Sequence, residues 1–217
     1  NYSNALKAYF KSLKIYEEIK QNKPRGIVLS NIGLIYTNIK DYKNALKFYS
    51  GALDIAEEEK DVESHLVTCI NIGLTHKLLE NYDDSLRFLN EALEISDRNN
   101  DKLRKSITLD LIGDVKSHLN DFKTAHEIYR ESLKMKIELE DKRGQAIVLT
   151  TIGNLQIKEG RLEEAKVNIE SALNISDELG IKRSIYENNK LLAELYEKQG
   201  KYDLSLKHFK ASYEKEL

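Results

Sequence analysis

Apolar and polar residues alternate along this chain with the period of an α-helix. Between Gly26 and Ile39 the apolar side chains Leu29, Ile32 and Tyr36 follow the i, i+3, i+7 spacing of one helix face. After Lys40 and Asp41 a second stretch shows the same spacing, with Tyr42, Ala45, Leu46, Tyr49, Ala52 and Leu53. The two stretches predict two amphipathic helices joined by a short turn, which form an antiparallel hairpin.

The same hairpin pattern returns every 40 residues. A small residue inside the first helix falls at Gly33, Gly73, Gly113, Gly153 and Ala193. A second series in the second helix comprises Ala45, Ser85, Ala125, Ala165 and Ser205. Small residues at a helix contact let the two axes approach closely. One such hairpin cannot bury both of its faces, so stacked copies are expected to form a solenoid.

Turn signals set the expected boundaries. Asp41, Asn81 and Asp121 are expected to cap the second helices, and Asp61, Asp101 and Asp141 to cap the first helices. Gly160, Gly180 and Gly200 suit the left-handed conformation that follows a helix, and Pro24 suits a first helical turn. The predicted organisation is a half repeat at 1–23, followed by full repeats at 24–60, 61–100, 101–140, 141–180 and 181–217.

These positions resemble the tetratricopeptide repeat (TPR) family. In the first full repeat the marker residues are Leu29, Ile32, Gly33, Tyr36, Ala45, Tyr49 and Ala52. Two departures are the absence of tryptophan and the absence of the proline that usually closes the repeat. The 40-residue spacing is similar to the long-helix branch that includes Pins-type adaptors, Rap regulators, kinesin light chain repeats and bacterial signalling proteins. The resemblance implies an all-α, right-handed solenoid of antiparallel helix hairpins, which binds a peptide or helix in a concave groove.

The first expected helix, in residues 1–20, lacks a partner ahead of it. Its apolar residues Tyr2, Leu6, Tyr9 and Leu13 would leave one side uncovered. A bare solenoid end lowers solubility. We therefore expect this chain to be a fragment of a longer protein; the alternative is a complete small protein with a frayed first helix. The open face of residues 1–20 could also serve a homodimer.

The face of each first helix that turns away from its hairpin partner is the expected binding groove. In the first full repeat this face carries Ile27, Ser30, Asn31, Leu34, Thr37 and Asn38. Across the repeats, the predicted groove residues are Asn31, Leu34, Asn38, Ile70, Asn71, Leu74, Asp110, Asp114, Asn154 and Lys190.

Each type of groove residue has two readings. The carboxamides of Asn31 and Asn71 could hold the backbone of an extended peptide, or each could bond a neighbouring helix. Leu34, Ile70 and Leu74 could anchor apolar side chains of a partner, or belong to the core. Asp110 and Asp114, one turn apart, form an acidic spot for a lysine, an arginine or an amino terminus, or they are simply solvated.

Composition excludes several other functions. Charged residues make up 32% of the 217 residues, yet the formal net charge is −2, which argues against nucleic-acid binding and membrane attraction. No apolar run approaches a membrane span and no signal peptide is visible, so a cytoplasmic location is expected. The single cysteine excludes an internal disulfide.

The sequence offers little catalytic chemistry. His65 and Cys69 lie one helical turn apart, but two ligands are too few for a metal, and Cys69 takes the place of Leu29 as a core residue. No phosphate-binding loop or paired carboxylates in a cleft are visible. We therefore predict no cofactor, no metal and no enzymatic activity.

The predicted function is a protein- or peptide-binding scaffold, as the interaction module of a larger bacterial signalling protein. A Lys-, Asn- and Ile-rich composition also favours a bacterial source. The alternatives are a dimerisation spacer, a stand-alone adaptor and, last, an enzyme.

Overall fold

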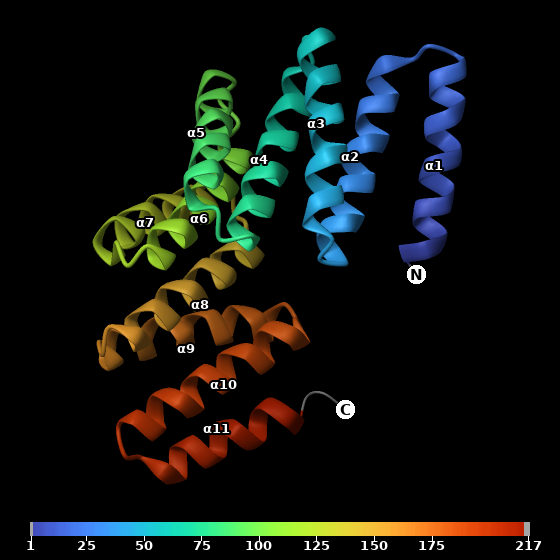
Figure 1. Cartoon of the computed structure of the whole chain (residues 1–217). Helices are drawn as coiled ribbons and strands as arrows, with labels where there is room; N and C mark the ends of the chain where they lie inside the picture. The colour runs from blue at the N-terminus through green and yellow to red at the C-terminus, as the bar shows by residue number, and fades with distance from the viewer. Residues whose placement is uncertain (1, 215–217) are drawn as a thin grey trace. The chain divides into compact units, whose positions relative to one another are not determined.

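The computed structural model describes residues 2–214, and within them the backbone forms eleven α-helices and no strand (Figure 1). The helices are α1 (Tyr2–Glu18), α2 (Asn22–Asn38), α3 (Tyr42–Glu58), α4 (Val62–Leu78), α5 (Tyr82–Arg98), α6 (Lys102–His118), α7 (Phe122–Glu138), α8 (Lys142–Lys158), α9 (Leu162–Glu178), α10 (Lys182–Lys198) and α11 (Tyr202–Glu214). We call α2, α4, α6, α8 and α10 the A helices, because each opens a repeat, and the others the B helices.

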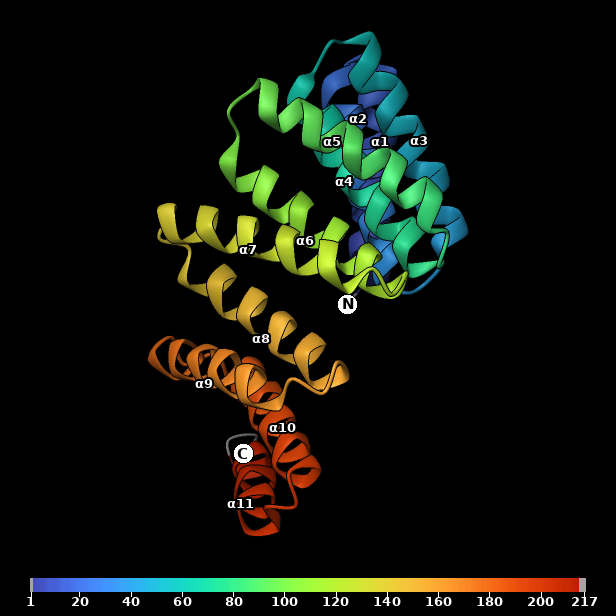
Figure 2. The same ribbon diagram turned by 90° about the vertical axis from the view of Figure 1, so that its left-hand side faces the viewer.

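The chain divides into two compact units, residues 1–115 and 116–217, which are described separately. In the first unit α2 packs on α1, α3 and α4, and α4 packs on α3 and α5. In the second unit α8 packs on α7, α9 and α10, and α10 packs on α9 and α11. Figures 1 and 2 show consecutive helices from α1 to α5, and from α7 to α11, running antiparallel and side by side. The predicted all-α architecture of stacked hairpins is confirmed.

Every helix from α1 to α10 has 17 residues, and a three-residue turn follows it. The middle residue of each turn has a positive φ, from Lys20 at 52° to Gly160 at 77°. In the turn after α2, Asp41 N–H donates to Tyr36 O (2.9 Å) and Lys40 N–H donates to Thr37 O (3.0 Å). These two bonds form the Schellman arrangement that closes a helix end. Gly160, Gly180 and Gly200 take the expected left-handed conformation.

Five of the six residues predicted to cap a helix do so through their side chains. Asp41 Oδ1 accepts from Asn44 N–H (3.2 Å), and Asp61 Oδ1 accepts from Ser64 N–H (3.2 Å). Asp101, Asp121 and Asp141 accept the corresponding bonds, and Asn81 does not. Asn81 therefore occupies the N-cap position of α5, but the prediction that its side chain caps the helix is wrong. Helix α2 begins at Asn22, so Pro24 lies in its first turn, as expected.

The repeated glycines of the A helices are buried at helix contacts. A Cβ on Gly33 would lie 2.7 Å from Tyr49 Cε1, and a Cβ on Gly73 would lie 2.6 Å from Leu89 Cγ. Tyr49 and Leu89 are fully buried. The large residue of the B helix thus packs directly on the glycine.

Helix α1 is the least buried element of the first unit. None of its residues is buried, and Tyr2, Phe10 and Ile15 are between 41% and 51% exposed. Phe10 contacts Phe48 of α3 with the two rings edge to face. The homodimer through residues 1–20 stays a prediction.

Candidate functional site

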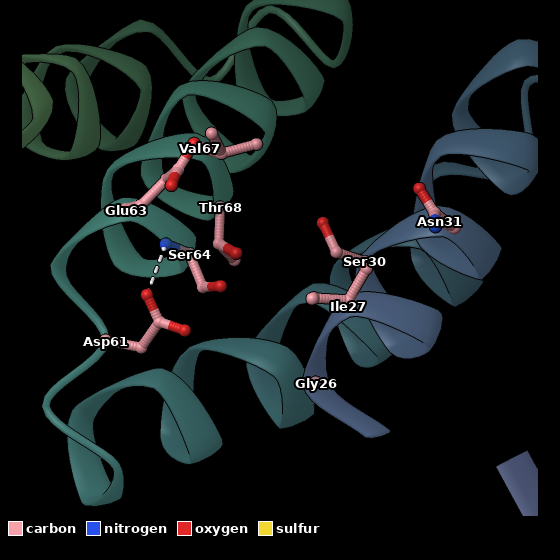
Figure 3. Close-up of a pocket in the computed structure, with 9 residues that line it drawn as sticks. All are labelled: Gly26, Ile27, Ser30, Asn31, Asp61, Glu63, Ser64, Val67 and Thr68. Atoms are coloured by element: carbon pink, nitrogen blue, oxygen red, sulfur yellow. Dashed lines mark hydrogen bonds between the residues drawn. The ribbon is translucent and has the colours of Figure 1, made fainter. Parts of the chain in front are cut away.

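A hollow of about 340 Å³ lies between the A helices α2 and α4 of the first unit (Figure 3). Its wall on α2 consists of Gly26, Ile27, Ser30 and Asn31, and its wall on α4 consists of Asp61, Glu63, Ser64, Val67 and Thr68. On α2 the hollow includes Ile27, Ser30 and Asn31 of the face predicted as a groove, but not Leu34 or Asn38, and the binding role of this face stays a prediction.

Helical periodicity explains which side chains reach this hollow. On α2, Ile27, Ser30 and Asn31 are three or four residues apart and share one face. On the other side, Asp61, Ser64 and Thr68 follow the same spacing from the N-cap of α4. The Asp61–Ser64 bond fixes the first turn of α4 at the mouth of the hollow, as the dashed line in Figure 3 shows.

The hollow combines apolar and polar groups. Ile27 is 51% exposed, and with the half-buried Val67 it supplies apolar surface. Ser30, Asn31 and Ser64 supply hydroxyl groups and a carboxamide. A site of this composition suits a peptide, because apolar contact supplies affinity and a few polar groups fix orientation.

The carboxamide of Asn31 is half-exposed, and no side-chain hydrogen bond links it to another residue of the described chain. Asn71 takes the position of Asn31 one repeat later, is also half-exposed, and in the span 2–214 its carboxamide likewise has no partner. The reading in which each asparagine bonds a neighbouring helix therefore receives no support from the structure. Both carboxamides keep their hydrogen-bonding capacity for a ligand.

The predicted apolar groove residues divide between surface and core. Leu34 is 41% exposed and Asn38 is exposed, one turn further along α2. Ile70 is half-buried and packs against the buried cluster of Leu66, Cys69 and Ala92. For Ile70 the core reading therefore holds at least in part. Leu74 is half-buried.

Thr37 does not lie on the open groove face where the sequence placed it. Its side chain is buried. Its hydroxyl donates to Gly33 O (3.2 Å) and contacts Tyr49 Oη (3.3 Å) and Thr75 Oγ1 (3.2 Å). These contacts tie α2 to both α3 and α4. Thr37 is thus a packing residue between repeats.

The acidic pair Asp110 and Asp114 lies on α6, and both residues are half-buried. Lys77 of α4 reaches Asp114, with Nζ 2.5 Å from Oδ2. The lysine expected to come from a partner at this place is therefore supplied, for Asp114, by the chain itself. The Lys77–Asp114 pair thus joins the neighbouring A helices α4 and α6.

The second unit holds the remaining two predicted groove residues. Asn154 on α8 is half-buried, and Lys190 on α10 is exposed. Between these helices the half-buried Thr150 donates from Oγ1 to Oδ1 of the buried Asn188 (2.8 Å), and this bond joins the two A helices.

Of the nine residues that line the hollow, only Asn31 is among the predicted groove residues, and Ile27 and Ser30 lie on the same predicted face; Gly26, Asp61, Glu63, Ser64 and Thr68 were missed. Asp61 had been assigned to capping alone. Stacking of the hairpins places the N-cap of one A helix beside the first half of the preceding A helix. This arrangement is the signal that could have placed Asp61 in the hollow. Glu63 is itself engaged, since its carboxylate pairs with Arg104 (2.7 Å).

Comparison with known families agrees with this geometry. A tetratricopeptide repeat model matches residues 24–98 and 63–138, which together exceed half of the chain, and a second tetratricopeptide repeat model matches residues 146–178. The chain belongs to the tetratricopeptide repeat family. Among curated proteins none matches the sequence.

Three solved structures illustrate the similarity of fold. BtubC (BKLC) from P. vanneervenii is 17% identical over 99% of this chain and 89% of that one, with a TM-score of 0.83. The apo form of RapI is 16% identical over 100% of this chain and 92% of that one, with a TM-score of 0.79.

The third is the Rap conjugation gene regulator of the plasmid pLS20, in complex with the Phr* peptide. It is 15% identical over 99% of this chain and 71% of that one, with a TM-score of 0.70. Arrays of this kind are protein-interaction scaffolds, and the chain is one of them. No helix within residues 2–214 is long and apolar enough to cross a membrane.

Proposed function

We propose that this scaffold binds an extended segment or a helix of another protein along the A-helix face of its first unit, at the hollow between α2 and α4. The observation that carries this proposal is the hollow of about 340 Å³ with the uncommitted carboxamide of Asn31 on its wall. A peptide backbone would accept from and donate to that carboxamide, while an apolar side chain of the peptide covers Ile27 and Val67.

The bound peptide of the pLS20 Rap regulator supports this mode of use, because that protein shares the fold. The proposed partner carries an apolar anchor for Ile27 and Val67. Beside the anchor, a basic side chain or an amino group would face the carboxylate of Asp61, which lines the same hollow.

We further infer that the scaffold serves as the interaction module of a bacterial signalling protein. Two Rap structures among its structural relatives support this inference, as does the Lys-, Asn- and Ile-rich composition. Such scaffolds are generally not enzymes, and we propose none of the chemistry of an enzyme for this chain. The sequence of the gene on either side of these residues would test the signalling context directly, by showing which domains accompany the scaffold.

Peptide display against the immobilised protein would test the groove. The peptides selected should share an apolar position with a basic neighbour, and should perturb the backbone amide NMR signals of Ile27, Ser30, Asn31 and Val67. Replacing Asn31 by alanine should weaken binding by about tenfold, which corresponds to the loss of one hydrogen bond to a peptide.

The matched control is Asn90→Ala. Asn90 is an exposed asparagine in the B helix α5, and it does not line the hollow. Its replacement should leave peptide affinity unchanged, and both variants should keep the melting temperature of the parent. Equal losses of affinity in the two variants, or amide shifts confined to the B helices, would refute binding at this hollow.

A further inference from the structure

Three side chains that ligate transition metals converge inside the second repeat. His65 and Cys69 lie one turn apart on α4, and Glu91 comes from the facing helix α5. One ligand atom from each of the three residues lies within 4.8 Å of the other two. His65 Nε2 is 2.6 Å from Glu91 Oε1.

This spacing is close to that of a tetrahedral zinc site. Zinc binds nitrogen and oxygen at about 2.0–2.2 Å and thiolate sulfur at about 2.3 Å, so its ligand atoms stand roughly 3.4–3.7 Å apart. The cluster of His65, Cys69 and Glu91 needs side-chain adjustments of about 1 Å to match this geometry. We propose that these three side chains form a binding site for a zinc-class divalent metal ion that joins α4 to α5.

The cluster is open on one side. A hollow of about 580 Å³ is lined by His65 and Glu91, together with Val62, Glu94, Ile95, Arg98 and Asn99. His65 and Glu91 have side-chain exposures of 20% and 42%, whereas Cys69 is fully buried beneath them. The hollow gives a metal ion access to His65 and Glu91, and the Cys69 sulfur lies close to the ligand atoms of both.

Glu94 is not part of the cluster of three, but it is the nearest further carboxylate along α5. It stands one turn after Glu91 on α5 and lines the same hollow, where it pairs with Arg98 (2.8 Å). Three protein ligands with a water in the fourth position are typical of open zinc sites, and a fourth protein ligand is typical of closed ones. Movement of Glu94 away from Arg98 would convert the first kind into the second.

Charge balance favours a cation at this place. The carboxylates of Glu91 and Glu57 act electrostatically on the buried Cys69 thiol. Binding of the ion replaces the thiol proton, so that a sulfur–metal bond forms, the S–H bond breaks and the proton leaves to solvent. The ion also relieves the repulsion between the new thiolate and the two carboxylates.

The set of ligands belongs to one repeat. At the positions of His65, Cys69 and Glu91, the preceding repeat has Arg25, Leu29 and Gly51, and the fourth repeat has Gln145, Leu149 and Ser171. Packing of the hairpin therefore requires neither the imidazole nor the thiol nor the carboxylate at these places. The third repeat has Lys105, Leu109 and Glu131, so the carboxylate recurs there, whereas the histidine and the cysteine occur only in the second repeat.

A simple ion pair is the competing explanation, and the chain contains one for comparison. In the second unit His126 Nε2 lies 2.5 Å from Glu159 Oε2, and the nearby Arg161 shares that carboxylate. No cysteine accompanies this second pair, since Cys69 is the one cysteine of the sequence. His126→Gln is therefore the matched control for loss of a histidine–glutamate pair.

Titration of the reduced, metal-free full chain with Co²⁺ tests the site. We expect one equivalent to bind and to give a near-ultraviolet thiolate-to-cobalt charge-transfer band with the visible bands of a tetrahedral ion, and Zn²⁺ to displace it. Cys69→Ser should abolish the charge-transfer band, and His65→Gln or Glu91→Gln should weaken Co²⁺ binding at least about tenfold. His126→Gln should bind as the parent does.

Far-UV circular dichroism of each variant verifies that it is folded. If a variant does not fold, the charge-transfer band of the parent protein still tests the proposal. Absence of the charge-transfer band in the parent would overturn the proposal. Full retention of affinity in His65→Gln and Glu91→Gln would overturn it as well, because the ion would then be held by the thiol and groups elsewhere.

Discussion

Alanine at Gly73 should destabilise the first unit, although alanine is the better helix former. In a helix interior, replacing glycine by alanine stabilises by about 1 kcal/mol. At Gly73 the new Cβ would lie 2.6 Å from Leu89 Cγ, 2.7 Å from Leu89 Cδ2 and 3.3 Å from the backbone oxygen of Ser85. Leu89 is fully buried, so it cannot move aside into solvent. Overpacking of this kind costs about 1–3 kcal/mol, which offsets or exceeds the gain.

Gly51 provides the internal comparison. It lies in α3 of the same unit, and a Cβ there would meet Leu29 Cδ1 at 3.5 Å, an ordinary contact. Gly51→Ala should therefore stabilise by up to about 1 kcal/mol. The free energies of unfolding of the two variants should differ by about 1–3 kcal/mol, because the helix-propensity gain is common to both and only Gly73→Ala adds a clash.

Urea unfolding followed by far-UV circular dichroism measures this difference. Gly73→Ala should lower the midpoint relative to Gly51→Ala without changing the slope of the transition. If Gly73→Ala raises the midpoint as much as Gly51→Ala does, then Leu89 and α4 separate at little cost. The glycine would then not be required by the approach of the two helices, and the packing argument would fail.

Three further outcomes follow from caps, turns and burial. Asp41→Ala should cost about 1 kcal/mol of unfolding free energy and Asn81→Ala much less, because only the aspartate side chain accepts a capping bond; urea midpoints compare them. Glu80→Gly should stabilise by up to about 1 kcal/mol, because the φ of Glu80 is 61° and glycine adopts this region without strain. The higher conformational entropy of glycine in the unfolded state opposes part of this gain, and thermal melts measure the net effect. Burial lowers the pKa of His76 below its ordinary value of 6.5, so the unfolded state binds the proton more readily. Stability from this group is complete above about pH 6.5 and is lost as the pH falls through the folded pKa; melts from pH 7.5 to 5 should show a smaller decline in His76→Gln.

The sequence was sufficient to predict the helices and their contacts, because both depend on spacing. Apolar residues at helical intervals located the hairpins, and the glycine series located the helix contacts at Gly33 and Gly73. The left-handed turn residues were visible only where they are glycine. Lys40 and Glu80 take the same conformation, although neither residue type signals it, because the backbone bonds of the helix end hold them there.

The site was harder to predict than the fold, because it depends on which side chains from different repeats meet. Asn31 follows from helical periodicity alone. The pairing of Asp114 with Lys77 does not, because a lysine side chain can reach several neighbours and its choice depends on the spacing of two A helices. The meeting of Glu91 with His65 and Cys69 likewise required the position of α5 against α4.

Function in this scaffold is expected where repeats differ, since the packing positions serve the same purpose in every copy. Helix α4 borders both proposed sites, on two sides of its cylinder. Val67 and Ser64 face the hollow shared with α2, whereas His65 and Cys69 face α5 and the proposed metal site. An ion that joins α4 to α5 would restrain the helix that forms one wall of the peptide hollow. With Zn²⁺ bound, α4 should lose less conformational entropy when the peptide binds. Peptide affinity should therefore rise with Zn²⁺ in the parent but not in Cys69→Ser. Calorimetric titration of a selected peptide with and without Zn²⁺ measures this coupling, and equal affinities in the two conditions would show that the two faces of α4 act independently.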